Sequence, residues 1–138
     1  MARADRACRR MPVHYEIDEA RSLIRTRCTG YVTLSEVLDH FHRLEAQAIS
    51  PLRLDVILDL SEITSLPTSD QLRTVSREIA RIRDTVRFGA CAIVAGTEAV
   101  FGTAMIFEVF AARGFRTTKV FREVATAEAW IADRRGAP

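Results

Sequence analysis

The chain has 138 residues, of which 48% are hydrophobic and 28% charged, and its net charge is +2 at pH 7. This composition suits one globular domain with a sizeable core and argues against a disordered chain. The charge is too close to neutral to indicate nucleic-acid binding, and no stretch approaches the ~18 apolar residues of a membrane span.

The amino terminus is basic, with arginines at positions 3, 6, 9 and 10, but it leads into no apolar stretch like that of a signal peptide. We predict that residues 1–10 form a disordered basic tail and that residues 11–135 form a single domain. A chain without a leader or a membrane span is expected to be cytoplasmic.

The first half of the domain predicts a hairpin followed by a helix. Apolar and polar residues alternate over 13–18 and again over 23–28, which is the period of a strand, and Gly30 ends the second strand. Thr33 and Glu36 form a capping-box pattern, after which apolar residues recur at helical spacing to about Gln47. Pro51 prevents the helix from continuing.

The centre of the chain predicts a buried strand and a second amphipathic helix. Residues 54–60 form a dense apolar run rich in β-branched side chains, and residues 61–67 read as a loop. Thr68 and Gln71 offer another capping box. The helix that follows has one apolar face, formed by Leu72, Val75, Ile79 and Ile82, and a charged opposite face.

The last third predicts two more strands and two more helices. Residues 88–95 form a third buried strand, and Thr97 caps a third helix that ends at Arg113-Gly114. A final strand lies near 118–121, and Thr126 caps a short last helix. The predicted order is β-β-α-β-α-β-α-β-α, an α/β domain with a mixed, mostly parallel sheet and helices packed on it.

Several strings support a resemblance to a known fold family. They are the hairpin end Thr29-Gly30, the strand LDVILDLS (54–61), and the segments AMIFEVFA (104–111), FRTTKVF (115–121) and AEAWI (127–131). With the element order, they resemble the STAS superfamily, and more closely the SpoIIAA-like group of small bacterial proteins. This resemblance implies a regulatory or protein-interaction module, and the similarity of the group to the lipid-carrying CRAL-TRIO fold implies an apolar ligand as the alternative.

Regulatory STAS proteins carry a phosphorylatable serine, typically within DSSG, at the start of the helix after the central strand. Here the matching segment is Pro67-Thr68-Ser69-Asp70, in which Ser69 keeps the serine position while proline and aspartate replace the flanking residues. Ser69 and Thr68 are therefore the candidate phospho-acceptors, and the competing interpretation is that they only cap the helix.

The third helix is apolar on almost every side, so more than one sheet face must cover it. Phe101, Met105, Phe107 and Phe110 are the candidate residues for an apolar ligand pocket or a dimer surface, and ordinary core packing is the third interpretation.

Cysteines and histidines give little indication of chemistry. Cys28 and Cys91 lie in apolar strands and are expected to be inert core thiols. The histidines are expected at the surface, and His40 and His42 point too far apart on their helix to share a metal easily.

These patterns contain no recognisable catalytic constellation, metal site or cofactor motif, and we expect a non-enzymatic protein. Our first hypothesis is a STAS-like interaction module that presents residues 61–70 and the second helix to a protein partner, with homodimerisation also expected. The alternative is a carrier or sensor of a small apolar, lipid-like molecule. A partner of the nucleic-acid class is not expected.

Overall fold

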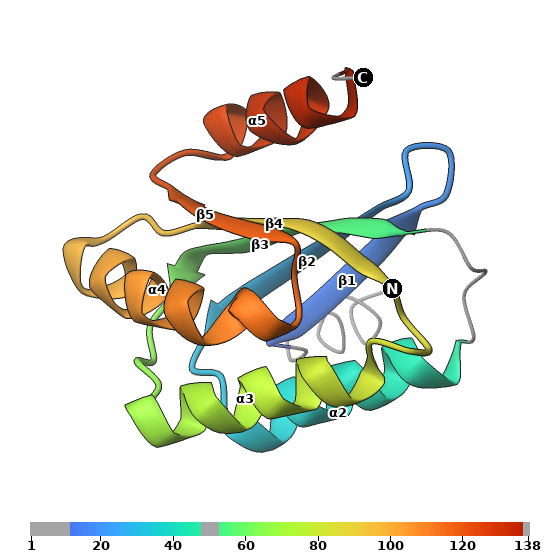
Figure 1. Ribbon diagram of the computed structural model, residues 1–138. Helices are drawn as coiled ribbons and strands as arrows, with labels where there is room; N and C mark the ends of the chain where they lie inside the picture. The colour runs from blue at the N-terminus through green and yellow to red at the C-terminus, as the bar shows by residue number, and fades with distance from the viewer. Residues whose placement is uncertain (1–11, 48–52, 137–138) are drawn as a thin grey trace, which may run out of the picture.

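A five-stranded sheet organises the domain (Figure 1). The computed structural model describes residues 12–47 and 53–136, so the predicted tail 1–10 lies outside the described residues. Strands β1 (Val13–Asp18) and β2 (Leu23–Gly30) form an antiparallel hairpin. Strands β3 (Leu54–Ile63), β4 (Phe88–Val94) and β5 (Thr117–Phe121) extend it in parallel, in the order β1-β2-β3-β4-β5.

Three helices cover one face of the sheet and a fourth covers the other. Helices α2 (Leu34–Ala46), α3 (Ser69–Ile82) and α4 (Glu98–Phe110) each connect one parallel strand to the next and lie on the same side (Figure 1). Right-handed crossovers that step in one direction across a sheet require this arrangement. Helix α5 (Val124–Gly136) follows the last strand and packs on the opposite face. The predicted α/β class and element order are confirmed.

The predicted caps set the starts of the three crossover helices. Thr33 Oγ1 accepts a hydrogen bond from the Glu36 amide, and the Glu36 carboxylate accepts one from the Thr33 amide. Thr68 and Gln71 make the same reciprocal pair at α3. Thr97 caps α4 through its side-chain oxygen. Each cap satisfies amides that the first helical turn leaves without a partner.

Several boundaries differ from the sequence predictions. Helix α4 ends at Phe110, and a 3-10 turn (Ala111–Arg113) occupies the predicted last turn before Gly114. Strand β3 continues past Leu60 because Glu62 and Ile63 pair with the end of β2, so the predicted loop begins three residues later. Thr126 is not a cap, because α5 already begins at Val124. The Thr126 hydroxyl donates to the Glu123 carbonyl at 2.8 Å, a local bond inside the first turns of the helix.

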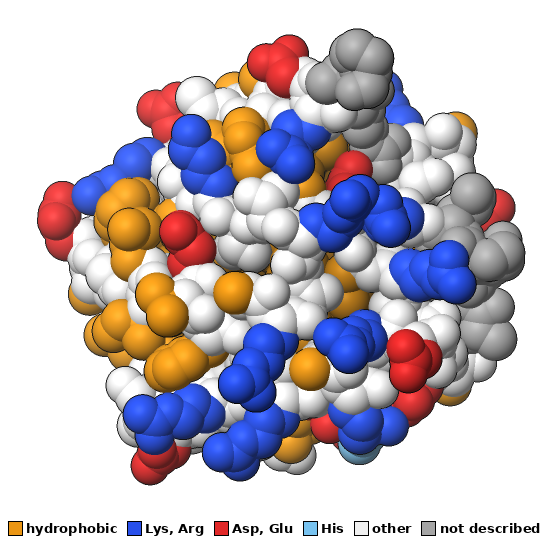
Figure 2. Space-filling model, in the orientation of Figure 1, with side chains coloured by type: hydrophobic (Ala, Val, Ile, Leu, Met, Phe, Trp, Pro, Cys, Tyr) orange, Lys and Arg blue, Asp and Glu red, His pale blue; other side chains and the backbone are white. Residues whose placement is uncertain are grey.

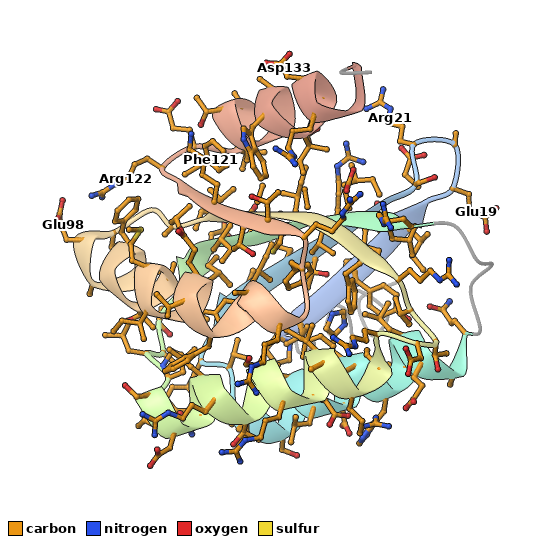
Figure 3. All side chains as sticks on the ribbon, viewed as in Figure 1. Glu19, Arg21, Glu98, Phe121, Arg122 and Asp133 are labelled. Carbon is orange, nitrogen blue, oxygen red and sulfur yellow. The ribbon has the colours of Figure 1, made fainter. Side chains whose placement is uncertain are left out.

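The sheet separates two cores of unequal size. The larger lies under α2, α3 and α4 and includes the fully buried Ile24, Leu44, Ile79, Ile82 and Ile93. The smaller lies under α5 and consists of Leu23, Ile57, Ala90, Ala92, Val94, Ala127 and Ile131. Figure 3 labels Phe121, whose ring packs on Trp130 of α5 at a centroid distance of 5.5 Å. Every residue of β4 is buried, as predicted for this strand.

Candidate functional site

An apolar cavity of about 160 Å³ lies between the sheet and the three crossover helices. The sheet contributes one wall, including Ile24, Val56 and Ile93, and each of α2, α3 and α4 contributes side chains to the other. The lining is mostly aliphatic and aromatic, with a few hydroxyl, amide and imidazole groups. A cavity of about 150 Å³ with aliphatic and aromatic walls is large enough for benzene, so this one can hold a molecule with a single ring or a short alkyl chain.

The most exposed lining residues place the mouth of the cavity at the carboxyl ends of β2 and β3. Thr33 and Leu66 line the cavity and are exposed, and they come from the loops that follow these two strands. The Ser65 hydroxyl joins the two loops, since it donates to the Val32 carbonyl at 3.1 Å and accepts from the Val32 amide at 2.9 Å. Ligands of open α/β sheets commonly bind outside the carboxyl ends of the strands.

One polar group in the cavity wall has no partner among the residues that the structure describes. His40, on α2, lines the cavity and is only 8% exposed, and its Nδ1 atom is buried without a hydrogen bond in the part of the chain that the structure describes. Such an atom costs about 1–3 kcal/mol unless something pairs with it. The ring lies edge-on to Tyr15 at a centroid distance of 4.9 Å. The prediction that the histidines lie at the surface is wrong for His40, and His14 and His42 are exposed.

Burial keeps the His40 imidazole uncharged. It lowers the pKa of His40 from 6.5 to about 4, and the positive charge of Arg43, one turn along α2, adds to the effect. The neutral ring has one nitrogen that donates and one that accepts a hydrogen bond. Sequence spacing could have identified this position, because His40 falls between Val37 and Leu44 on the apolar face of the helix.

The two candidate phospho-acceptors lie beside the mouth. Pro67 lines the cavity, Thr68 is the N-cap of α3, and Ser69 is the exposed first residue of the helix. The Thr68 hydroxyl oxygen is already engaged by the Gln71 amide at 3.2 Å, which is the capping role considered from the sequence. Phosphorylation of Ser69 stays a prediction.

The four candidate residues of the third helix fall on different sides of α4. Phe107 is buried and lines the cavity, whereas Met105 is 45% exposed on the outer side. Phe101 and Phe110 are half-buried at the edges, each beneath a cation: Arg122 lies 4.1 Å from the Phe101 ring centroid and Arg73 lies 5.5 Å from that of Phe110. Arg122 also pairs with Glu98 at 3.1 Å, and Figure 3 labels both. Only Phe107 of the four belongs to the cavity lining.

The outer side of α4 forms an apolar stripe, defined by Met105, Ile106 and Val109. Ile106 is 46% exposed and Val109 is 74% exposed. Figure 2 shows hydrophobic side chains gathered where Figure 1 places α4, with basic side chains along the border toward α3. A groove of about 520 Å³ lies at this border, lined by Val109, Phe110 and Arg73, Arg77 and Arg113. Nothing within the described chain therefore covers the apolar outer side of the helix.

The two described cysteines have the core environment predicted for them. Both are free and buried, and burial raises the pKa of Cys28 to about 12 and that of Cys91 further still. Thiols so far from ionisation are poor nucleophiles. Within residues 12–47 and 53–136, no group of three or more His, Cys, Asp or Glu side chains could hold a metal ion. No helix in these ranges has both the length and the apolar character to cross a bilayer.

Comparison with known proteins gives a structural match without a sequence match. No family model matches the chain, and no curated protein matches it significantly. An uncharacterized protein from the DUF3478 family, from Shewanella loihica PV-4, has a solved structure described as a SpoIIAA-like fold. It is 14% identical and superposes with a TM-score of 0.57 over 86% of this chain and 91% of that one. The chain therefore has a SpoIIAA-like α/β fold, which confirms the resemblance drawn from its sequence.

Proposed function

We propose that this protein is a non-enzymatic module that binds a small apolar molecule, as a carrier or as a sensor. The observation that carries this proposal is the cavity of about 160 Å³ with its mouth at the carboxyl ends of β2 and β3. Apolar walls bind by excluding water and hold no charged ligand, because burying an unpaired charge costs far more than the contacts return. The cavity favours a carrier or sensor of a small apolar molecule over an interaction module without a ligand.

In a sensor, ligand binding has to change a surface that a partner can recognise. Leu66 and Pro67 line the cavity and directly precede the N-terminus of α3, where Thr68 and Ser69 lie. These residues belong to the segment 61–70 that the sequence suggests as a partner surface. In this proposal, ligand occupancy changes the position of that segment, which unites the regulatory and ligand-binding hypotheses in one mechanism.

Benzene is a suitable first probe because its size fits the cavity. In a spectrum of the isotopically labelled protein, the methyl signals of Ile79 and Ile93, which line the cavity, should shift as benzene is added. Those of Ile57 and Ile131, in the core under α5, should stay in place and serve as an internal control. Ala104→Phe fills the cavity from α4 and should abolish the shifts. Unmoved Ile79 and Ile93 signals in the parent protein would refute a ligand site here.

A second candidate function is self-association through the apolar stripe of α4, in line with the homodimer expected from the sequence. Contiguous apolar surface often marks an interaction site, and this stripe brings three exposed apolar side chains together on one helix. An antiparallel copy of the helix would place Met105 of one chain opposite Val109 of the other, which is the self-complementarity that a two-fold dimer needs.

Light scattering tests the dimer. The parent protein should scatter as a dimer and Val109→Glu as a monomer, because the charge would be buried in the interface. Ala129→Glu, a matched change at an exposed position of α5 on the opposite side of the sheet, should leave the dimer intact. Phe107 is unsuitable for this test because its side chain belongs to the core. A monomeric parent protein would end the dimer hypothesis and leave the ligand proposal unaffected.

A further inference from the structure

The groove between α3 and α4 has short side chains along part of its lining and arginines on both sides. Four residues at the spacing of one helix face line it from α3: Arg73, Ser76, Arg77 and Ala80. The end of α4 and the turn after it form the other side: Val109, Phe110, Ala112 and Arg113. The groove has a volume of about 520 Å³ and follows α3 for about two helical turns, or about 10 Å. This shape suits an elongated occupant.

The two sides of the groove are tied to each other by contacts between α3 and the end of α4. The Ser76 hydroxyl donates a hydrogen bond to the Phe110 carbonyl. Gly114 packs so closely on Ile79 that a side chain at this position would collide with it, which brings the turn after α4 against α3. A surface already held in its binding shape spends little free energy on ordering when a partner arrives.

The arginines of the groove carry more positive charge than their neighbours neutralise. Arg73 pairs with Asp70 at 3.2 Å and lies over the ring of Phe110. Arg77 and Arg113, one on each side of the groove, are exposed, and neither guanidinium has an acidic partner among the residues that the structure describes. Figure 2 shows basic side chains bordering the apolar surface of α4. Positive charge on both sides of an apolar groove favours an acidic occupant.

We propose that the groove binds an acidic amphipathic helix of a partner protein. The apolar face of that helix packs on Val109 and Phe110, and its carboxylates pair with Arg77 on one side and Arg113 on the other. This surface lies outside the cavity, so the proposal does not depend on a ligand there.

The shape and charge of the groove favour this occupant over two others. A flat bilayer surface fills a concave groove poorly. A second copy of the chain, packed through the apolar stripe, brings its own arginines to the same border and places like charges near each other. Val109 belongs to both the stripe and the groove, so the helix and a second copy compete for this face.

A designed peptide of about 15 residues, with leucines along one helical face and glutamates and alanines elsewhere, is a direct probe. A peptide with lysine in place of each glutamate is its control. Fluorescence anisotropy should show that only the glutamate peptide binds, and less tightly at high salt.

Charge reversal in the groove tests the two arginines. Arg77→Glu and Arg113→Glu should each weaken binding of the glutamate peptide about tenfold, because an attraction becomes a repulsion. Both side chains are exposed, so the fold should tolerate the change. Arg134→Glu, the same change at an exposed position of α5 on the opposite face of the sheet, is the control and should leave binding unchanged.

The methyl NMR signals of the parent protein give a second readout that needs no variant. The glutamate peptide should shift the signals of Val109, which lines the groove, and leave those of Ile131, in the core under α5, in place.

Four results would each refute the proposal. The glutamate peptide does not bind, or the lysine peptide binds equally well. Both groove variants bind the glutamate peptide as tightly as the parent protein does, in which case the peptide binds elsewhere. The parent protein is a dimer that the peptide does not dissociate, so that a second copy covers this face. Vesicles of an anionic lipid bind through the two arginines while the peptide does not, which would assign the surface to a membrane.

Discussion

The two faces of the sheet are closed in different ways. On one face a single helix, α5, lies over Ala90 and Ala92 of β4, whose small side chains let the helix approach closely. On the other face three helices are held by the strands that they connect, and larger side chains project from both layers. About 160 Å³ remains open there. A helix joined to a strand at one end can adjust its position until it packs closely. A helix joined to a strand at each end has less freedom and can leave a space.

The largest expected effect breaks the close packing under α5. Ile131 is buried in α5, and Ile131→Ala should lower the free energy of unfolding by about 2–5 kcal/mol, because it removes buried methyl groups and leaves a void. Urea denaturation at pH 7 measures the change. A loss below about 1 kcal/mol would mean that this face is as loosely packed as the other, and the contrast between the faces would disappear.

A matched pair of alanines sharpens the contrast directly. Ala127 of α5 and Ala104 of α4 are both buried toward the sheet, but only Ala104 lines the cavity. Ala127→Leu should cost about 1–3 kcal/mol through overpacking. Ala104→Leu should cost clearly less, because its extra methyl groups enter open space. Thermal unfolding of the two variants tests this difference, and equal losses would contradict it.

The cavity face should also respond to pH through His40. The pKa of His40 is about 4 in the folded protein and 6.5 in the unfolded chain, so the unfolded state binds the proton first as pH falls. Stability is therefore intact above about pH 7 and declines as pH falls from 6.5 toward 4. With about 1.4 kcal/mol per pKa unit, roughly 2 kcal/mol is lost by pH 5.

His40→Phe isolates this contribution, because it removes the titrating group and keeps an aromatic ring. Chemical denaturation at pH 7 and pH 5 should show a smaller loss in the variant than in the parent by about 2 kcal/mol. Hydrogen bonds to Arg81 lower the pKa values of Glu45 and Glu78. Protonation of these carboxylates therefore affects stability at a lower pH than protonation of His40 does. Identical losses in the two proteins would show that the His40 ring binds a proton as readily in the folded protein as in the unfolded chain.

The smallest effects are expected at the mouth of the cavity. Thr68→Ala removes the N-cap of α3 and should cost about 1 kcal/mol. Ser69→Asp should leave stability nearly unchanged, because Ser69 is exposed and a negative charge suits the start of a helix. Thermal denaturation distinguishes the two. A larger loss for Ser69→Asp than for Thr68→Ala would reverse the roles assigned to these neighbours.

The sequence predicts the elements well because they depend on local patterns. The capping boxes at Thr33 and Thr68 give the starts of α2 and α3, and the alternation over 13–18 gives β1 with both its ends. The extension of β3 through Glu62 was missed because it depends on pairing with β2, a contact between residues far apart in the chain. Thr126 was misassigned because a threonine near a helix start is equally able to bond backward to a carbonyl.

The candidate site was less predictable for a physical reason. Periodicity identifies α4 as apolar on nearly all sides, but it does not indicate that Phe107 turns inward while Met105 stays exposed. The cavity is the space left over when three helices meet one sheet, and no short segment of sequence encodes it. His40 was expected at the surface, although its apolar helical position could have identified it as buried. No sequence pattern could show that its Nδ1 atom lacks a partner among the described residues.

Helix α5 differs from the other three helices in how it can separate from the sheet. Helices α2, α3 and α4 lie between paired strands, so none can leave without disturbing the strands beside it. Helix α5 follows β5 and does not connect two paired strands, so it can separate from the sheet without breaking any strand pairing. Its amides should therefore exchange with solvent through a local opening of lower free energy than the opening that exposes the sheet. The sheet and helices α2, α3 and α4, which enclose the cavity, should therefore unfold as one cooperative unit. Helix α5, on the opposite face, should be able to detach separately.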